Sequence, residues 1–430
     1  MNIAHQLERN AARLARLPGL SRPPVYRGAA LLLVIAGLVG LYLFARYTVP
    51  VLPVGFWRLC AFCLTALAVL WWFLRGARRF SQHGRARRQL GDLGPGNPED
   101  ERLPLQRMQQ ELAHARHIIA RSPDITRGRN PLYRTPWFLF VGDQQSQVAE
   151  LLASACKVSP FPAPKREPNA DDQHWYWWFF KSMIAIESHW CLVSDPHQRL
   201  ERGLWYQALQ LLANDRDRLP LNGLVVCVGA STLLQEPDAI RAVAMRLRRL
   251  TDEALEHLQI QMPIYLVVTG LEQLPGCREF CAALPAQALE RALGHRLPAN
   301  APISAATSQQ FDELYSPIVQ RLQALRMSVL REQKEPHGRY ATWFFVDSLS
   351  RLGPGLHSLV TLMLEDNPFQ RTPQWRGLYF TASGTPESGL PAQGAFISDL
   401  FTRLLPADQP LASPSPVSYT HLTLPTNREV

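Results

Sequence analysis

Two uncharged apolar runs near the N-terminus constrain the fold of this chain more strongly than any other feature of its sequence. The first run is Ala29–Ala45, seventeen residues without a charged side chain, and the second is Leu59–Leu74. Each run approaches the roughly 20 residues that a helix needs to cross a bilayer. The sequence therefore predicts a transmembrane hairpin within residues 1–88, rather than a cleaved signal peptide or a buried helical hairpin of a soluble domain.

Arginine is concentrated beside these two runs. Residues 1–88 carry 13 arginines, no lysine and one acid, Glu8, so their net charge is +12, whereas residues 89–430 carry 32 bases and 35 acids. Most of these arginines precede the first run or follow the second, and the positive-inside rule then places both ends of the hairpin in the cytoplasm. The overall charge of +9 reflects this membrane topology, so we expect no nucleic-acid partner.

The remainder of the chain predicts an α/β fold. Residues 89–131 are predicted to be a linker followed by a helix that starts near Leu105. Residues 132–290 alternate continuous apolar runs with helical patterns, which is typical of a parallel sheet with crossover helices. Residues 291–410 are predicted to form a helical subdomain that closes with a short strand-like segment, and residues 411–430 an unstructured tail.

The end of the tail, residues 417–430, differs in character from everything upstream. One natural codon choice for it reproduces a transposon end that is used in sequencing-library preparation. We interpret these residues as translated adapter at the end of an incomplete gene. Resequencing that returned the same codons in frame, followed by a stop codon, would contradict this interpretation.

The turn after the first predicted strand has the setting of a phosphate-binding loop but not its chemistry. A phosphate-binding loop has the pattern G-x-x-x-x-G-K-[ST], in which backbone N–H groups and the lysine face the phosphates and the hydroxyl binds magnesium. Gly142 fits the first glycine, and Ser146 is the hydroxyl within the loop. Gln147, Val148 and Ala149 occupy the positions of the second glycine, the lysine and the magnesium-binding hydroxyl.

Several segments in sequence order are similar to motifs of the IcmF/TssM family, the large inner-membrane subunits of type VI secretion systems. The resemblance covers nearly all of residues 25–406, and it includes the two apolar runs. The segments that carry it are Thr135–Gly142, Trp177–Phe179, Ile184–Ser188, Arg218–Val226, Met262–Thr269, Phe311–Leu314, Arg376–Thr385 and Phe396–Phe401.

This chain departs from the family pattern where family members with intact motifs resemble small GTPase-type switches. The resemblance places Glu187 in a metal and switch motif that is usually D-T-A-G. It places Thr269 and Glu272 at the ends of a base-reading motif that is usually [NT]-K-x-D. Both acids are one methylene longer than the aspartates they replace. We therefore expect a P-loop GTPase-like domain with a vestigial nucleotide site, no bound cofactor or metal, and no enzymatic activity.

Two other interpretations of these residues remain open. In the first, Val148 and Ala149 simply start a helix that packs on the sheet, and Glu187 is a solvated residue at a strand end. In the second, the chain is an active membrane-bound NTPase in which Ser146, Glu187 and Thr269 serve the metal, switch and base roles.

The resemblance also implies a place in the cell and a set of partners. It implies a structural and docking subunit in the bacterial inner membrane, with its N-terminus and soluble domain in the cytoplasm. It implies contact with a TssL-like inner-membrane subunit and with baseplate proteins, membership of an oligomer, and contact with a TssJ-like lipoprotein through a periplasmic part that this sequence does not contain. A membrane adaptor outside secretion is the alternative.

Overall fold

The computed structural model describes residues 98–122, 131–157, 159–165, 174–194, 199–216, 218–299, 307–364 and 373–414. The chain divides into two units, residues 1–81 and residues 82–430, and all described residues belong to the second unit. The predicted transmembrane hairpin therefore lies outside the described residues. Within the described ranges, no helix has both the length and the apolar character that crossing a membrane requires.

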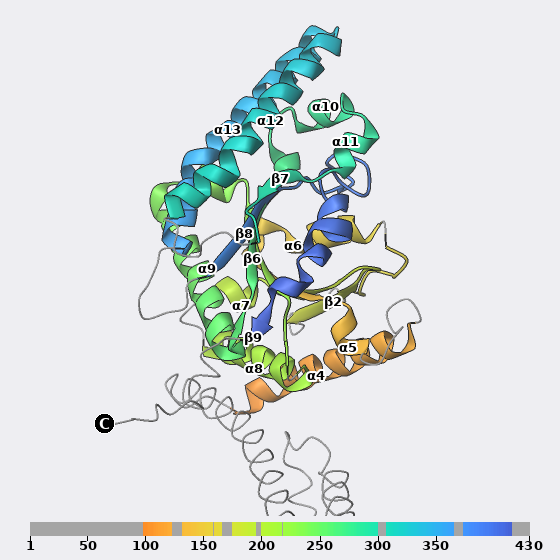
Figure 1. The fold of residues 1–430 in the computed structure, drawn as a ribbon, viewed down its shortest axis with the longest axis vertical. Coiled ribbons are helices and arrows are strands. Elements are labelled where there is room, and N and C mark those ends of the chain that lie inside the picture. The colour runs from red at the N-terminus through yellow and green to blue at the C-terminus, as the bar shows by residue number, and fades with distance from the viewer. Residues whose placement is uncertain are drawn as a thin grey trace, which may run out of the picture. The chain divides into compact units, whose positions relative to one another are not determined.

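A seven-stranded sheet with the order β2-β3-β1-β4-β6-β8-β7 forms the centre of this unit (Figure 1). The five inner strands, from β3 to β8, run parallel, whereas β2 and β7 are antiparallel at the two edges. The strands are β1 Trp137–Gly142, β2 Trp175–Phe179, β3 Ile184–Ser188, β4 Gly223–Gly229, β6 Pro263–Thr269, β7 Leu293–Arg296 and β8 Gln374–Phe380. The predicted α/β class with a mostly parallel sheet is confirmed.

The inner strands are apolar along their whole length because both faces of the sheet are covered. In β4, Leu224 and Val226 pack into one hydrophobic cluster, and Val225 and Cys227 pack into a second cluster on the opposite face. Successive side chains of a strand point to opposite faces. A strand that is buried on both sides therefore shows no polar alternation, as the sequence of β4 shows.

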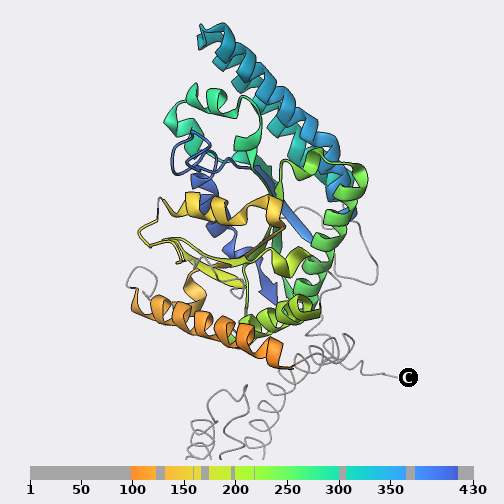
Figure 2. The same ribbon diagram turned by 180° about the vertical axis from the view of Figure 1, so that it is seen from behind.

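Helices cover both faces of the sheet (Figures 1 and 2). One face packs against α4, α8, α9, α10, α12 and α13, and the other against α6 and the C-terminal segment 397–405. The helices are α4 Pro98–Arg121, α5 Pro131–Arg134, α6 Val148–Cys156, α7 Cys191–Ser194, α8 Arg199–Asp215, α9 Pro237–Leu258, α10 Cys277–Ala282, α11 Ala286–Glu290, α12 Thr307–Glu332, α13 Pro336–Leu364 and α14 Leu405–Ala407. Short 3-10 turns are η1 Gln144–Ser146, η2 Thr232–Leu234, η3 Leu271–Gln273 and η5 Gln409–Leu411, and Leu400–Leu404 is a π-helical turn.

Residues 291–410, predicted to be a helical subdomain, also supply two strands of the sheet. The long helices α12 and α13 lie side by side in this range, but β8 pairs with β6 on one side and with β7 on the other. The prediction missed β7 because this strand has four residues, Leu-Gly-His-Arg, and shows no apolar periodicity. The helical part of 291–410 is thus built onto the same sheet as residues 132–290.

Two other boundaries differ from the predictions. The helix α4 begins at Pro98 rather than near Leu105, since proline is well accommodated in the first turn of a helix. Ser413–Pro414, inside the predicted unstructured tail, forms β9 and pairs antiparallel with β5, Ile260–Gln261. The rest of the tail, residues 415–430, lies outside the described residues.

Candidate functional site

The predicted site residues lie at or just beyond the carboxyl ends of the parallel strands, where open α/β sheets usually bind ligands. Gly142 ends β1, Glu187 lies next to the end of β3, and Thr269 ends β6. Thr269 is paired in register with Gly229 at the end of β4. The structure therefore brings the loops after several strands to one edge of the sheet, with the turn after β1 in the middle.

We call residues 142–147 the β1 turn. Its first residue must be glycine, because a Cβ at Gly142 would lie 2.2 Å from Ser146 Oγ and 2.8 Å from the carbonyl oxygen of Cys227. The carboxylate of Asp143 accepts a hydrogen bond of 3.0 Å from the Ser146 N–H, and Ser146 Oγ donates to the Asp143 carbonyl at 2.5 Å. The polar groups of Asp143 and Ser146 thus bond to each other inside the turn.

Thr269, at the end of β6 and two strands away from β1, bonds to the β1 turn. Its hydroxyl donates a hydrogen bond to the backbone carbonyl of Ser146, and both side chains are fully buried. In the NTPase interpretation, Ser146 would hold a metal ion and Thr269 would read a base. In the structure, each of these two hydroxyl groups donates its proton to a backbone carbonyl of the protein itself.

Glutamine side chains from the β1 turn bond to the loops after β4 and β6. Gln145 Oε1 accepts hydrogen bonds from Thr232 Oγ1 at 2.8 Å and from Gln235 Nε2 at 2.9 Å. Gln147 Oε1 accepts one from Gln273 Nε2 at 2.7 Å. Gln147 also adopts a left-handed backbone conformation, with φ of 47°, directly before α6. These bonds join the β1 turn to two neighbouring loops.

Val148 and Ala149 begin α6, where a phosphate-binding loop would have its lysine and hydroxyl. Val148 is buried and packs into the cluster that contains Phe138 and Phe140, and Ala149 is partly exposed. Asp143 is the charged residue of the β1 turn. Burial raises its pKa, although the hydrogen bond from the Ser146 amide opposes this shift.

Glu187 does not lie in solvent, so that part of the alternative interpretation is wrong. Its side chain is 3% exposed, and Glu187 Oε2 accepts a hydrogen bond of 2.8 Å from the indole N–H of Trp178 on β2. The two residues lie on the antiparallel pair β2–β3. The indole N–H of Trp178, in the edge pair of the sheet, therefore holds the Glu187 carboxylate.

Glu272 also bonds within the protein. Its Oε2 accepts a hydrogen bond of 2.8 Å from the N–H of Ser383, in the loop after β8. Burial raises the pKa of this carboxyl group, and the backbone hydrogen bonds it accepts oppose the shift. The adjacent Gly384 N–H donates to Ser154 Oγ on α6 at 2.9 Å. Glu272, which was predicted to lie in a motif that recognises a nucleotide base, thus bonds to the loop after β8.

The predicted site residues therefore separate into two groups. Gly142, Ser146 and Thr269 are brought together, whereas Glu187 and Glu272 bond to Trp178 and to the loop after β8. Sequence analysis missed Thr232, Gln235, Gln273 and Ser383, which make the closing contacts described above. The one sequence feature that could have indicated these four residues is their position, because each lies a few residues after a buried strand. No group of three or more His, Cys, Asp or Glu side chains that could hold a metal ion occurs in the described ranges.

These features define a class of protein: an α/β domain with a mostly parallel sheet, whose β1 turn has the position of a phosphate-binding loop and bonds to its own neighbouring loops. Residues 198–422 match the family model described as the IcmF-related N-terminal domain, which is more than half of the chain. The chain belongs to the IcmF/TssM family.

A curated relative supports the same assignment. The chain is similar to the type VI secretion system component TssM1 of Pseudomonas aeruginosa, with 26% identity over 294 residues. This match covers 66% of the chain, and the chain spans about a quarter of the relative, 26% of its length. No solved structure matches the chain.

Proposed function

We propose that this chain is a structural and docking component of a type VI secretion membrane complex, and that its GTPase-like domain neither binds nor hydrolyses nucleotides. The observation that carries the proposal is the set of hydrogen bonds within and around the β1 turn. A triphosphate at Gly142 would need free N–H groups and a cation. This turn instead offers the carboxylate of Asp143, and the hydroxyl of Ser146 is bonded inside the turn.

The absence of the phosphate-binding lysine removes a large part of the free energy of nucleotide binding. One charge-assisted hydrogen bond contributes roughly 1.5–3 kcal/mol, so exchanging the lysine for Val148 alone weakens binding by about tenfold to a hundredfold. The bonds of Thr269 and Gln273 to the turn oppose the opening that a phosphate would require. The active-NTPase alternative needs Ser146, Glu187 and Thr269 to leave the partners they have here.

The proposal includes an anchor in the inner membrane. It is supported by the two apolar runs, by the arginine-rich flanks and by the similarity to TssM1. In this arrangement the hairpin holds the chain in the membrane, the α/β domain lies in the cytoplasm, and the partners are a TssL-like subunit and baseplate proteins within an oligomer.

Exposed apolar side chains near the connection between α12 and α13 give the docking role a candidate surface. Met327, Tyr340 and Trp343 are 52%, 64% and 47% exposed. Large apolar side chains at this exposure are common in protein interfaces, where aromatic residues contribute much of the binding energy. We expect Trp343→Ser to weaken co-purification with the baseplate proteins while leaving the melting temperature within about 2 °C. The matched substitution Trp190→Ser, at another exposed tryptophan, is the control.

Calorimetry on the full chain in detergent, with magnesium and ATP or GTP, tests the absence of nucleotide binding. We expect no nucleotide binding at the β1 turn at millimolar concentration. As a positive control, the triple variant Gln147→Gly/Val148→Lys/Ala149→Thr restores the loop pattern and is expected to gain measurable affinity. A micromolar Kd in the unmodified chain that persists after Arg321→Gln, a substitution outside the β1 turn, would contradict the proposal, and hydrolysis that is lost on Glu187→Ala would support the NTPase alternative.

A further inference from the structure

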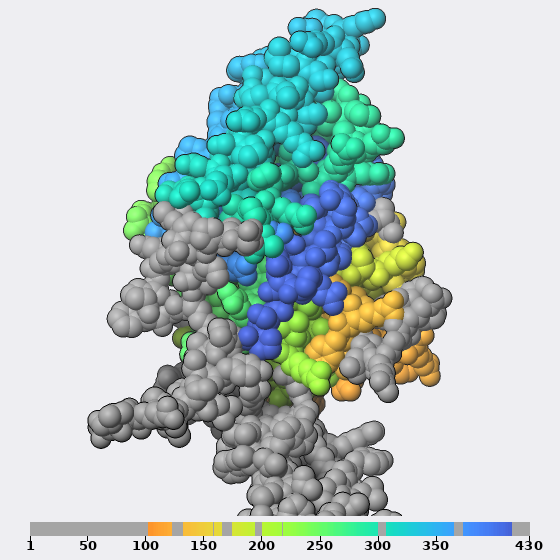
Figure 3. Space-filling view, viewed as in Figure 1, coloured from red at the N-terminus to blue at the C-terminus, as the bar shows by residue number. Residues whose placement is uncertain are grey.

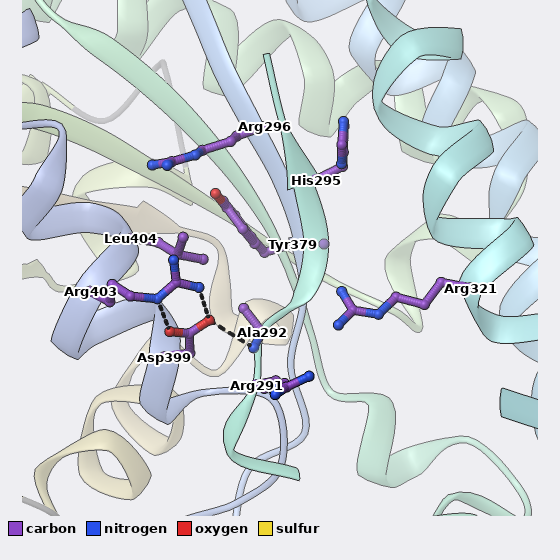
Figure 4. Close-up of a pocket in the computed structure, with 10 residues that line it drawn as sticks. Arg291, Ala292, His295, Arg296, Arg321, Tyr379, Asp399, Arg403 and Leu404 are labelled. Carbon is purple, nitrogen blue, oxygen red and sulfur yellow. Dashed lines mark hydrogen bonds and ion pairs between the residues drawn. The ribbon is translucent and has the colours of Figure 1, made fainter. Parts of the chain in front are cut away.

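A basic pocket opens beside the edge strand β7, away from the β1 turn (Figure 4). Its volume is about 610 Å³, which is within the range of small-molecule sites. Four arginines line it, together with one carboxylate and one tyrosine: Arg291, Arg296, Arg321, Arg403, Asp399 and Tyr379. No residue of the β1 turn contributes to this lining, so the pocket is separate from the vestigial nucleotide site.

The charges in the pocket do not balance. Four guanidinium groups face one lining carboxylate, which leaves a net charge of +3 with His295 neutral. Asp399 accepts two hydrogen bonds from Arg403, at 2.6 and 2.7 Å, and this pairing fixes the guanidinium at the wall of the pocket. Arg403 also lowers the pKa of Asp399, so this carboxyl group stays ionised. The pocket is thus cationic at neutral pH.

The remaining arginines differ in their partners. Arg296 Nη1 lies 3.5 Å from Asp408, a carboxylate that is already bonded twice by Arg376. Arg291 acts on Asp399 through its charge, but neither Arg291 nor Arg321 makes a hydrogen bond or ion pair within the part of the chain that the structure describes. Figure 4 shows Arg321 reaching from α12 toward β7, while Arg296 and Arg403 lie on the other side of the strand. An anion that contacts all of them must extend across the strand edge.

Tyr379 lies across the strands at the centre of this pocket. A Cβ at Gly294 would lie 2.3 Å from the tyrosine ring, and one at Gly377 would lie 2.8 Å from it, so both glycines are needed to seat the ring. The side chain is 2% exposed, and its hydroxyl has no hydrogen-bond partner among the described residues. Burial raises the pKa of Tyr379, so the hydroxyl keeps its proton and can donate. A buried donor without a partner is rare in folded proteins.

We propose that this pocket binds a small anion that carries two or more phosphate groups, either free in solution or as the headgroup of a diphosphate lipid. Guanidinium groups match phosphate oxygens with paired hydrogen bonds. The net charge of +3 already includes Asp399, so a ligand with a single negative charge would leave most of it unbalanced. Arginines on both sides of β7 favour a ligand with two separated anionic groups.

Titration calorimetry on the full chain in non-ionic detergent tests the proposal with three probes: pyrophosphate, 1,3-bis(glycerophospho)glycerol as a soluble diphosphate headgroup, and citrate. Arg291→Gln and Arg321→Gln remove no hydrogen bond seen among the described residues, so neither should unfold the protein. We expect each to weaken binding of the preferred phosphate probe about tenfold. Arg331→Gln, an exposed arginine on the same helix α12, is the matched control and should change the affinity less than twofold.

The outcomes separate the sources of the ligand. Tighter binding of pyrophosphate supports a soluble phosphate compound, and tighter binding of the glycerol diester supports a lipid headgroup. The proposal is overturned if neither probe binds at millimolar concentration, if citrate binds as tightly as either, or if the arginine variants behave like Arg331→Gln. Pyrophosphate that binds at the β1 turn instead would be insensitive to Arg321→Gln and would contradict both proposals.

Discussion

At the scale of single residues, short polar side chains hold the strand ends together. Asn222 Oδ1 accepts a hydrogen bond of 3.0 Å from the backbone N–H of Trp137, and it also accepts one from the buried Arg216 at 3.2 Å. This contact joins two of the segments that resemble the family, Thr135–Gly142 and Arg218–Val226. The contact explains why the second segment has asparagine at position 222, whose side-chain oxygen accepts both hydrogen bonds.

Thr269→Val is expected to lower the free energy of unfolding by about 1–3 kcal/mol, because it leaves the carbonyl of Ser146 buried without its donor. Urea unfolding followed by circular dichroism measures this change. Thr402→Val is the control, since Thr402 is exposed and bonds within its own turn, and its effect should stay below about 0.5 kcal/mol. Equal effects at the two sites would rule out a special role for Thr269.

Asp252 on α9 gives a pH dependence with a defined sign. Burial raises its pKa to about 6, and Glu253 and Glu256 add to the shift while Arg248 opposes it. The folded state therefore binds a proton more tightly than the unfolded state, whose value is 3.8. Stability from this group is present below the unfolded value and is lost as pH rises through about 6.

Replacing Asp252 by Asn should remove this contribution. We expect the melting temperature of the unmodified chain to fall, relative to the Asp252→Asn variant, between about pH 4 and pH 7. Melting curves of both proteins at half-unit steps of pH measure the difference. Parallel profiles across that range would show that Asp252 titrates alike in the folded and unfolded chains.

At the scale of elements, the sequence predicted the buried parallel strands and the helical character of the region after residue 290, but it missed the edge strand β7. Continuous apolar runs such as β4 and β6 have one stable environment, a sheet covered on both faces. The helix α13 contains Pro354, a residue that removes a backbone hydrogen bond and usually ends a helix. In the structure the helix continues, and Tyr315 Oη donates at 3.4 Å to the Ser350 carbonyl that Pro354, lacking an N–H, leaves free. A contact between residues this far apart in the chain cannot be predicted from the sequence around Pro354.

Side-chain contacts between distant loops of the candidate site could not be predicted from the sequence either. The sequence could place Gly142, Ser146 and Thr269 at one site, because all three follow parallel strands. The hydrogen bonds of Gln145 and Gln147 could not be predicted. A glutamine side chain can reach several neighbours, and which one it bonds to depends on the final spacing of the loops. The pairing of Glu272 with Ser383 joins residues 111 positions apart, in loops whose proximity requires β8 to lie beside β6.

Two glycines of α13 test how closely this helix approaches its neighbours. A Cβ at Gly355 would lie 2.1 Å from the Leu233 carbonyl oxygen of the backbone, whereas one at Gly353 would meet the hydroxyl of Tyr315 at 2.7 Å. Gly355→Ala should therefore destabilise the protein by about 1–3 kcal/mol, despite the better helix propensity of alanine. Gly353→Ala should cost less, since a tyrosine side chain can move. Urea unfolding of the two variants measures both changes in the free energy of unfolding, and equal changes would contradict this explanation.

At the scale of the whole described unit, Asp408 connects the C-terminal segment to the sheet. Its carboxylate accepts two hydrogen bonds from Arg376, at 2.8 and 2.9 Å, and one from Tyr265 Oη at 2.8 Å. Asp408 is 5% exposed. Figure 3 shows the C-terminal residues, in blue, covering this face of the unit. The segment is thus held to both β6 and β8 by one buried group.

Asp408→Ala is expected to lower the free energy of unfolding by about 3–5 kcal/mol, because it leaves the Arg376 guanidinium buried without its counter-ion. Asp347→Ala is the matched control: it breaks a more exposed pair with Arg351 and should cost less than about 1 kcal/mol. Urea unfolding of both variants measures the contrast. A cost below 1 kcal/mol for Asp408→Ala would show that the segment stays attached through apolar packing alone.

The position of β8 between β6 and β7 has a consequence for how the protein is made. A ribosome finishes β6 at Thr269 but reaches β8 only at Gln374, more than 100 residues later. At bacterial elongation rates this interval is on the order of 5–20 s. During it the nascent chain carries an apolar strand edge without its final neighbour, so chaperone depletion should harm the yield of this protein more than that of a domain whose adjacent strands are translated in succession.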